Sequence, residues 1–163
     1  YSPTSVSSEE SFILKKQLGY KDEDKIIILV ARMSWAKGIK QFCESSDFLR
    51  EKYPDVKFLM VGQDDSGSPD SVPKSYIKKY VNFENFNYLG YRIDIKELYS
   101  ISYLAVFPSY YREGGWPRGL TEPMSMGMPV ITTDNKHCSG AVIDGYNGLI
   151  VPIKDSSALA EGI

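Results

Sequence analysis

The sequence has few of the residues that bind metal ions or form disulfides. It contains two cysteines, Cys43 and Cys138, and one histidine, His137. The common zinc sites use four ligands, mostly Cys and His at short spacings, so these three residues exclude a zinc site of that kind. We expect both thiols to be reduced, semi-buried and structural, as free cysteines usually are.

An excess of positive charge and a long apolar segment are also absent. The formal net charge is −2, whereas a domain that binds DNA or RNA normally has clustered Lys and Arg and a high pI. No apolar run approaches the roughly 18 residues that a membrane-spanning helix needs, and no secretory signal opens the sequence. We therefore expect a cytoplasmic protein that binds no nucleic acid, with peripheral membrane association left open for the full-length protein.

The composition is typical of one globular domain. The chain has 163 residues, of which 42% are hydrophobic and 25% charged, enough to bury a core. The Ser- and Pro-rich start, Tyr1–Ser8, predicts a linker, and a short helix is expected from about Glu9 to Leu18, closed by Gly19. We interpret residues 1–24 as a linker and lead-in helix, and residues 25–163 as the folded domain.

Apolar runs of strand length alternate with segments of helical periodicity. The runs are Lys25–Ala31, Val56–Val61, Phe86–Leu89, Tyr103–Phe107, Val130–Thr132 and Leu149–Val151. Continuous apolar runs are typical of strands covered on both faces. This alternation predicts an α/β fold, a doubly wound parallel sheet of about six strands with right-handed crossovers. Asp94 is expected to cap one helix and Pro117 to begin another.

The loops that follow the strands are the candidate binding sites, because ligands of open parallel sheets bind beyond the carboxyl ends of the strands. Arg32 and Lys37 follow the first run, where a helix N-terminus would add free N–H donors and partial positive charge. Such a set suits a diphosphate, although solvated loop cations are the ordinary alternative. Further along, Gly114 and Gly115 allow backbone amides to approach a ligand closely.

Carboxylates and a turn complete the candidate site. Glu113 precedes the Gly pair and Glu122 lies in the helix that follows, and carboxylates are natural acceptors for sugar hydroxyls. The Gly90–Arg92 turn offers backbone groups to a nucleobase edge. A solvated glutamate and an ordinary turn are the alternatives. The adjacent Asp64 and Asp65 could bind a metal, but their Ser- and Gly-rich loop favours solvated carboxylates.

Taken in order, these segments resemble the C-terminal domain of retaining GT-B glycosyltransferases, the large family 4 group also called glycosyl transferases group 1. The likeness extends from about Lys25 to Ile163. It is carried by Val-Ala-Arg32 with Lys-Gly38, Met-Val-Gly62, Tyr-Leu-Gly90, Val-Phe-Pro-Ser109, Tyr-Arg-Glu-Gly114, Pro-Arg-Gly-Leu-Thr-Glu122, Gly-Met-Pro-Val-Ile-Thr-Thr-Asp134 and Asp-Gly-Tyr-Asn-Gly-Leu-Ile-Val151.

The resemblance implies a role for each matching residue. Arg32 and Lys37 would neutralise the donor diphosphate, and Glu113 would join them as the catalytic set. Different segments would contact the transferred sugar, the phosphates with the ribose, and the base. The donor-binding residues implied are Gly114, Gly115 and Trp116 for the sugar, Leu120 and Thr121 for phosphates and ribose, Glu122 for the ribose hydroxyls, and Gly90, Tyr91 and Arg92 for the base.

One spacing departs from the family pattern. Eight residues separate Glu113 from Glu122, one more than is usual, and the extra residue falls in the Gly114–Trp116 segment. The placement of Glu113 is therefore open, and Trp116 is either a stacking surface for the sugar or a packing residue.

The resemblance also implies a substrate and a partner domain. The donor would be a nucleotide diphosphate-sugar, with UDP-sugars favoured, and neither a metal nor another cofactor would be bound. An acceptor glycan would bind an N-terminal domain that this sequence does not contain, so we expect the isolated chain to be inactive. A GT-B-fold nucleotide-sugar epimerase and a non-catalytic nucleotide-binding module are the alternative readings.

Overall fold

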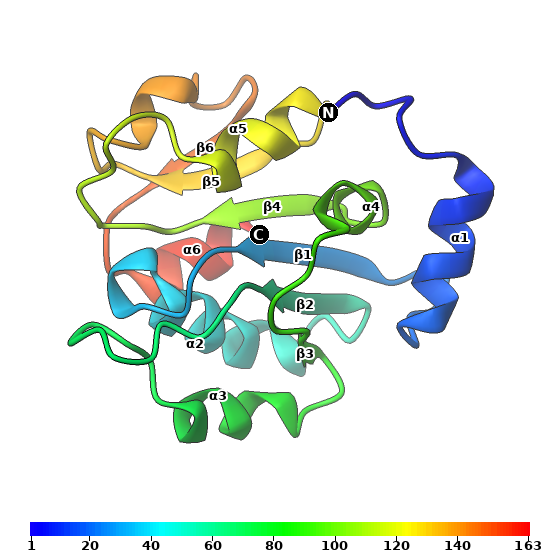
Figure 1. Ribbon diagram of the computed structural model, residues 1–163, viewed down its shortest axis with the longest axis horizontal. Coiled ribbons are helices and arrows are strands. Elements are labelled where there is room, and N and C mark those ends of the chain that lie inside the picture. Colours follow the sequence, from blue (N-terminus) through cyan, green and yellow to red (C-terminus); the bar gives the residue numbers. More distant parts are fainter.

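The structure is a computed structural model that describes residues 1–163, and it contains one six-stranded sheet (Figure 1). The strands are β1 (Lys25–Val30), β2 (Val56–Val61), β3 (Phe86–Tyr88), β4 (Leu104–Phe107), β5 (Val130–Thr133) and β6 (Gly148–Val151). They pair in the order β3-β2-β1-β4-β5-β6, and every neighbouring pair is parallel. The predicted doubly wound parallel sheet is confirmed.

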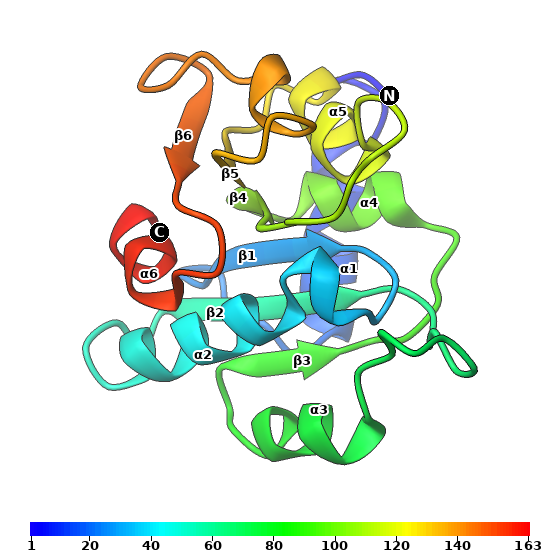
Figure 2. The same ribbon diagram turned by 90° about the vertical axis from the view of Figure 1, so that its left-hand side faces the viewer.

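Helices cover both faces of this sheet. They are α1 (Ser8–Gln17), α2 (Ile39–Arg50), α3 (Lys74–Val81), α4 (Ile95–Ser100), α5 (Arg118–Ser125) and α6 (Ser156–Gly162), with short 3-10 turns η1 (Trp35–Lys37) and η2 (Ser139–Ala141). Figure 2 shows α2, α3 and α6 on one side of the sheet and α4 and α5 on the other.

Alternate side chains of β1 enter two separate cores. Ile27 and Leu29 pack with residues of α2, α3 and α6, whereas Ile26 and Ile28 pack with residues of α1, α4 and α5. Because successive side chains of a strand point to opposite faces, a strand that is buried on both sides must be apolar throughout. This is why β1 is apolar from Ile26 to Val30, whereas Lys25 at its exposed start is charged.

The sheet order creates a crevice at the point where the chain reverses direction across the sheet. After β1 the chain builds outward through β2 and β3, then returns to place β4 on the other side of β1. The loops after β1 and β4 consequently leave the sheet in opposite directions, and a ligand site opens between them. In Figure 1 these loops lie at the end of the sheet opposite α1.

Two glycines allow the loops around this crevice to meet. A Cβ on Gly62 would lie 1.7 Å from the carbonyl oxygen of Ala31, and one on Gly119 would lie 2.6 Å from that of Val30. No other residue fits such contacts, so the end of β2 and the start of α5 both sit directly against the end of β1.

The structure corrects two expectations about helix ends. Asp94 is the N-cap residue of α4 but makes no side-chain cap bond, because its carboxylate is bound by Arg92 instead. Pro117 was expected to be the first helical residue of α5. It is instead the N-cap residue, and the helix begins at Arg118. None of the helices has both the length and the apolar composition needed to cross a bilayer.

Candidate functional site

A pocket of about 460 Å³ lies at the carboxyl ends of β1 and β2, bounded by the turn after β3 and the first turn of α5. It brings together four residues that the sequence singled out, Arg32, Tyr91, Arg92 and Glu122. Its lining consists of Tyr1, Val30, Ala31, Arg32, Val61, Gly62, Gln63, Tyr91, Arg92, Ile93, Ile95, Arg118, Gly119 and Glu122. We call it the switch-point pocket.

A larger cavity, of about 780 Å³, lies at the opposite end of the sheet beside α1. Its only cation is Lys15, whose Nζ donates to the carbonyl oxygens of Asp22 (2.9 Å) and Asp24 (2.8 Å). That cavity therefore offers no free positive charge, and the switch-point pocket is the better candidate for an anionic ligand.

Arg32 extends from the end of β1 to the loop after β2. Its Nη1 donates to Oδ1 of Asp65 at 3.0 Å, with the arginine side chain 50% exposed and the aspartate only 14%. The neighbouring Asp64 pairs with Lys74 at 3.1 Å. Asp65 is thus more enclosed than the solvated carboxylate we expected, whereas Asp64 stays partly exposed at 29% and pairs with an exposed lysine.

Lys37 and Glu113 form the most enclosed ion pair of the site. The Lys37 Nζ lies 2.6 Å from Glu113 Oε1, and their side chains are 10% and 11% exposed. Ser109, which is fully buried, also donates to that oxygen at 2.9 Å. The Lys37 ammonium lies 4.7 Å from the Tyr111 ring centroid and 5.7 Å from that of Phe107, within range of cation–π attraction. Neither charged residue lines the switch-point pocket.

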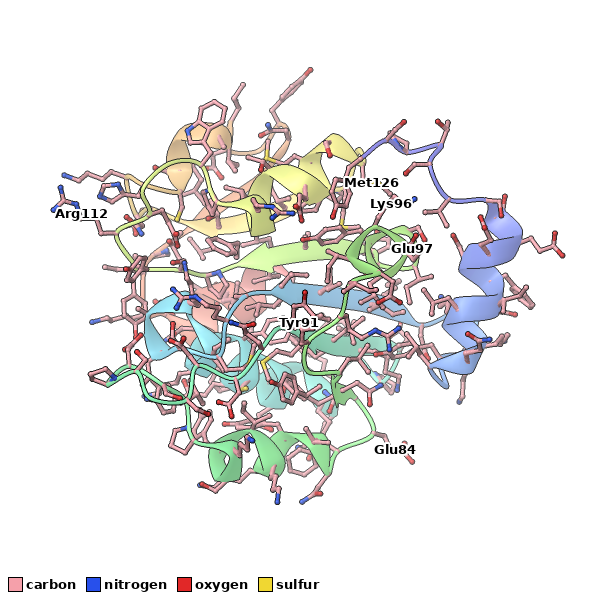
Figure 3. The ribbon with its side chains drawn as sticks, in the orientation of Figure 1. Glu84, Tyr91, Lys96, Glu97, Arg112 and Met126 are labelled. Atoms are coloured by element: carbon pink, nitrogen blue, oxygen red, sulfur yellow. The ribbon has the colours of Figure 1, made fainter.

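The segment that holds the extra residue is an exposed part of the loop, and Glu113 before it is paired with Lys37. Gly114, Gly115 and Trp116 are exposed and line no part of the pocket, and nothing lies within 4 Å of a Cβ placed on either glycine. Trp116 is 68% exposed, so it is not a core packing residue. In the same loop Arg112 projects away from the molecule (Figure 3).

Glu122 is held by an arginine one turn earlier on α5. Nε and Nη2 of Arg118 both contact Glu122 Oε1, at 2.7 and 2.6 Å, while Oε2 has no hydrogen-bond partner. The glutamate side chain is 12% exposed and the arginine 84%. The sequence analysis overlooked Arg118, although its position four residues before Glu122 is the spacing at which helical ion pairs form.

The free amides at the start of α5 belong to its first two residues and not to Leu120 and Thr121. The N–H groups of Leu120 and Thr121 both donate to the carbonyl of Pro117 at 3.0 Å, and the Leu120 side chain is completely buried. Leu120 and Thr121 are therefore unavailable as donors to a ligand. The preceding N–H groups, of Arg118 and Gly119, have no partner, and both residues line the pocket. These two N–H groups are free because α5 starts at Arg118.

The turn after β3 is fixed by a backbone bond and an ion pair. Gly90, at φ +68°, accepts a hydrogen bond from the Gly62 N–H at 2.8 Å. Arg92 donates from Nε to Asp94 Oδ1 at 2.7 Å and also contacts Oδ2. This contact lowers the pKa of Asp94 and raises that of Arg92. Tyr91 is 69% exposed on the rim of the pocket (Figure 3).

Both cysteines are free, as expected, but they are fully buried and not partly buried as predicted. Burial, together with the nearby Glu113 carboxylate, raises the pKa of the Cys138 thiol to about 11. A thiol with so high a pKa is a poor nucleophile at neutral pH, so Cys138 contributes packing beneath the Lys37–Glu113 pair.

Comparisons with known proteins agree with this architecture. The family described as "Glycosyl transferases group 1" matches residues 10–163. An N,N'-diacetylbacillosaminyl-diphospho-undecaprenol alpha-1,3-N-acetylgalactosaminyltransferase from Campylobacter jejuni is 32% identical over 161 residues, which cover 99% of this chain and 40% of the relative. The putative glycosyltransferase EpsD of Bacillus subtilis is 29% identical over 158 residues, 97% of this chain and 40% of that protein.

Solved structures share the fold. Anabaena Alr3699/HepE, crystallised in complex with UDP and glucose, superposes with a TM-score of 0.84 at 24% identity, over 99% of this chain and 44% of that one. The C-terminal domain of LpcC, a glycosyl transferase group 1 family protein from Francisella tularensis, gives 0.79 at 20% identity, over 99% and 82% of the two chains. The present chain spans about 40% of the length of the curated relatives named above.

Proposed function

The chain belongs to the glycosyl transferases group 1 family and corresponds to its C-terminal GT-B domain, and we propose that it binds the nucleotide-sugar donor of a retaining glycosyltransferase. The observation that carries the proposal is the switch-point pocket, in which Arg32, the free N–H groups of α5 and Glu122 surround one cavity. A UDP-sugar is the proposed donor, and the Anabaena protein with a closely similar fold binds UDP and glucose.

Each part of the pocket suits a different part of a nucleotide. The Tyr91–Arg92 turn would contact the base, and Glu122 would accept the ribose hydroxyls through its unoccupied Oε2. The diphosphate would lie toward Arg32 and the start of α5, where a helix N-terminus favours negative charge. Lys37, which follows Arg32 in the same loop, would add a second cation.

The chemical step would depend on stabilising the leaving group. When the bond from the sugar to the diphosphate breaks, negative charge builds up on the diphosphate oxygens. Preorganised positive charge directed at that position lowers the barrier most effectively. Glu113, which itself accepts a hydrogen bond from Ser109, holds the Lys37 ammonium in a single enclosed place before any ligand arrives, so little reorganisation would be needed during the reaction.

A binding experiment tests the role of Lys37. We expect Lys37→Ala to weaken UDP binding by roughly 10- to 100-fold, since a hydrogen bond to a charged group contributes about 1.5–3 kcal/mol, and to weaken UMP binding much less. The measurement is titration calorimetry with both nucleotides. Lys40→Ala is the matched control, because Lys40 lies on the exposed face of α2 and pairs with Glu44. Equal losses for UDP and UMP would remove Lys37 from the diphosphate site.

We also propose that the donor charge is neutralised by these cations and amides without a divalent ion or other cofactor. No three His, Cys, Asp or Glu side chains gather where they could hold a metal, and Asp64 and Asp65 are each paired with a cation. UDP affinity should then be the same, within about twofold, in excess EDTA and in millimolar Mg²⁺. A tenfold gain with Mg²⁺ would contradict this part of the proposal.

The acceptor is proposed to bind the remainder of a longer protein. The relatives are more than twice as long as this chain, and the C. jejuni relative's name describes transfer to a lipid-linked sugar. We therefore propose a role in the synthesis of a polysaccharide or other glycoconjugate, with an acceptor glycan or lipid-linked glycan.

A further inference from the structure

Glu122 is the most enclosed charged side chain of the switch-point pocket. It is 12% exposed, compared with 50% for Arg32, 33% for Arg92 and 84% for Arg118. A carboxylate in such a place requires a partner, because removing a charge from water is costly. The partner is Arg118, so the two side chains act as a unit.

The geometry of this unit leaves half of the carboxylate available. Arg118 directs both Nε and Nη2 to the same oxygen, Oε1, and leaves Oε2 without a partner. A guanidinium is a rigid fork that fixes the orientation of the group it binds. With one oxygen fixed in this way, the carboxylate of Glu122 cannot turn freely, and Oε2 keeps a constant position.

The pair also balances charge inside a pocket proposed to receive a diphosphate. The charge of Glu122 is felt nearby, since burial and then the Glu122 carboxylate raise the pKa of Tyr1, which lines the same cavity. An uncompensated Glu122 would repel an incoming anion, and the positive charge of Arg118 offsets that repulsion.

The chain contains ordinary surface pairs for comparison. Arg50 and Asp47 form an i,i+3 pair at 3.1 Å on α2, but the aspartate there is 42% exposed. Such pairs typically contribute less than about 1 kcal/mol and orient nothing else. What distinguishes Arg118 is an enclosed acid partner on the wall of a cavity.

We infer that Arg118 is a positioning residue, which holds Glu122 so that Oε2 accepts a hydroxyl of the donor ribose; this inference rests on the proposed function. Arg118 consequently contributes to the preference of the pocket for ribonucleotides through Glu122, without itself being required to touch the ribose.

The experiment compares affinities for UDP and its 2′,3′-dideoxy analogue by calorimetry. The wild-type protein should prefer UDP by roughly 10- to 100-fold, since a hydrogen bond to a charged group contributes about 1.5–3 kcal/mol, and Glu122→Ala should lose this preference. Arg118→Ala should reduce the preference to within about twofold of the Glu122→Ala value, and Arg118→Lys should restore part of it. Arg50→Ala should leave both affinities unchanged.

The outcomes distinguish failure of the inference from failure of the proposed function on which it rests. Equal weakening of UDP and the dideoxy analogue by Arg118→Ala, or no change in either, overturns the inference alone. A wild-type protein that binds UDP without preferring ribose overturns the ribose assignment of Glu122 and the inference with it. Failure to bind any nucleotide overturns the proposed function itself. Thermal melts show whether Arg118→Ala is folded. Arg118→Lys allows the same comparison of the affinities for UDP and the dideoxy analogue with the cation retained.

Discussion

At the scale of single residues, every cation that lines the switch-point pocket is already paired with a carboxylate, and so is the enclosed Lys37 outside it. The pairs are Arg32–Asp65, Lys37–Glu113, Arg92–Asp94 and Arg118–Glu122. An anionic ligand therefore enters a site with little net charge and must share partners that are already engaged. Long-range attraction contributes little to such binding, and the positions of the side chains contribute most.

The Arg92–Asp94 pair makes the stability of the β3–α4 turn dependent on pH. Arg92 holds the pKa of Asp94 below its usual value, so the carboxylate stabilises the fold fully above its unfolded pKa of about 3.9. This contribution is lost as the pH falls through the lower pKa of the folded state. We expect Asp94→Asn to destabilise the protein at pH 7 by about 0.5 kcal/mol, a figure already reduced for solvent exposure.

Urea unfolding at pH 7 and at pH 3 checks this expectation. The difference between the wild type and Asp94→Asn should shrink at the lower pH, because the wild-type carboxylate is then becoming neutral. Asparagine is as good an N-cap residue as aspartate, so the substitution isolates the charge. An equal difference at both pH values would mean that the ion pair is not its source.

Asp94 also illustrates what could not be predicted from the sequence. Asp94 stands directly before a helix, which predicts a cap, but an arginine two residues earlier binds the carboxylate first. In the same way, nothing in the loop sequence showed that Asp65 would meet Arg32, because these residues are 33 positions apart. Side-chain partners from different loops depend on the finished fold, and a pattern along the chain does not contain them.

At the scale of elements, the site depends on how closely α5 packs against β1. Gly119, in the first turn of α5, faces the carbonyl of Val30 and the ring of Phe107, with Cβ distances of 2.6 and 2.8 Å for any larger residue. Alanine is intrinsically better than glycine in a helix by about 1 kcal/mol. Here the clash is with backbone, which cannot easily move, so the steric cost should outweigh that gain.

We expect Gly119→Ala to destabilise the domain by about 1–3 kcal/mol and to weaken UDP binding, because α5 and its free amides would move away from β1. Gly114→Ala is the matched control, since its Cβ would meet nothing within 4 Å and its φ is not in the left-handed region. Chemical unfolding and calorimetry on both variants supply the comparison. A Gly119→Ala protein as stable as Gly114→Ala would contradict the packing argument.

Elements were the most predictable level of the structure. All six strands lie where apolar runs predict them, with no end shifted by more than one residue, since burial on both faces requires such runs. The order of the strands in the sheet could not be predicted in this way, because every strand has the same apolar pattern and none specifies its neighbour. The switch point between β1 and β4, and with it the pocket, becomes visible only once that order is known.

At the scale of the whole molecule, residues 1–163 should bind nucleotide without transferring sugar. The cations, the free amides and Glu122, which is proposed to contact the ribose, all belong to this chain, but Arg32 and Arg118 remain half or more exposed. Water therefore reaches the diphosphate and weakens each electrostatic contact. Incubation with UDP-sugars and candidate acceptors, followed by mass spectrometry, should show no acceptor product. Acceptor-dependent transfer by this chain alone would contradict the proposal that the acceptor binds the remainder of a longer protein.

The order of the strands also sets when nucleotide can begin to influence folding during synthesis. The pocket takes its walls from residues 30–32, 61–63, 91–95 and 118–122, so its last wall is made more than eighty residues after its first. A ligand stabilises only a state that it can bind, and a nascent chain that ends before α5 lacks the amides and Glu122. The β1–β3 half must consequently hold together through its own apolar contacts. Under the proposed function, a nucleotide-sugar would protect the completed domain from unfolding but would not guide the assembly of its first half.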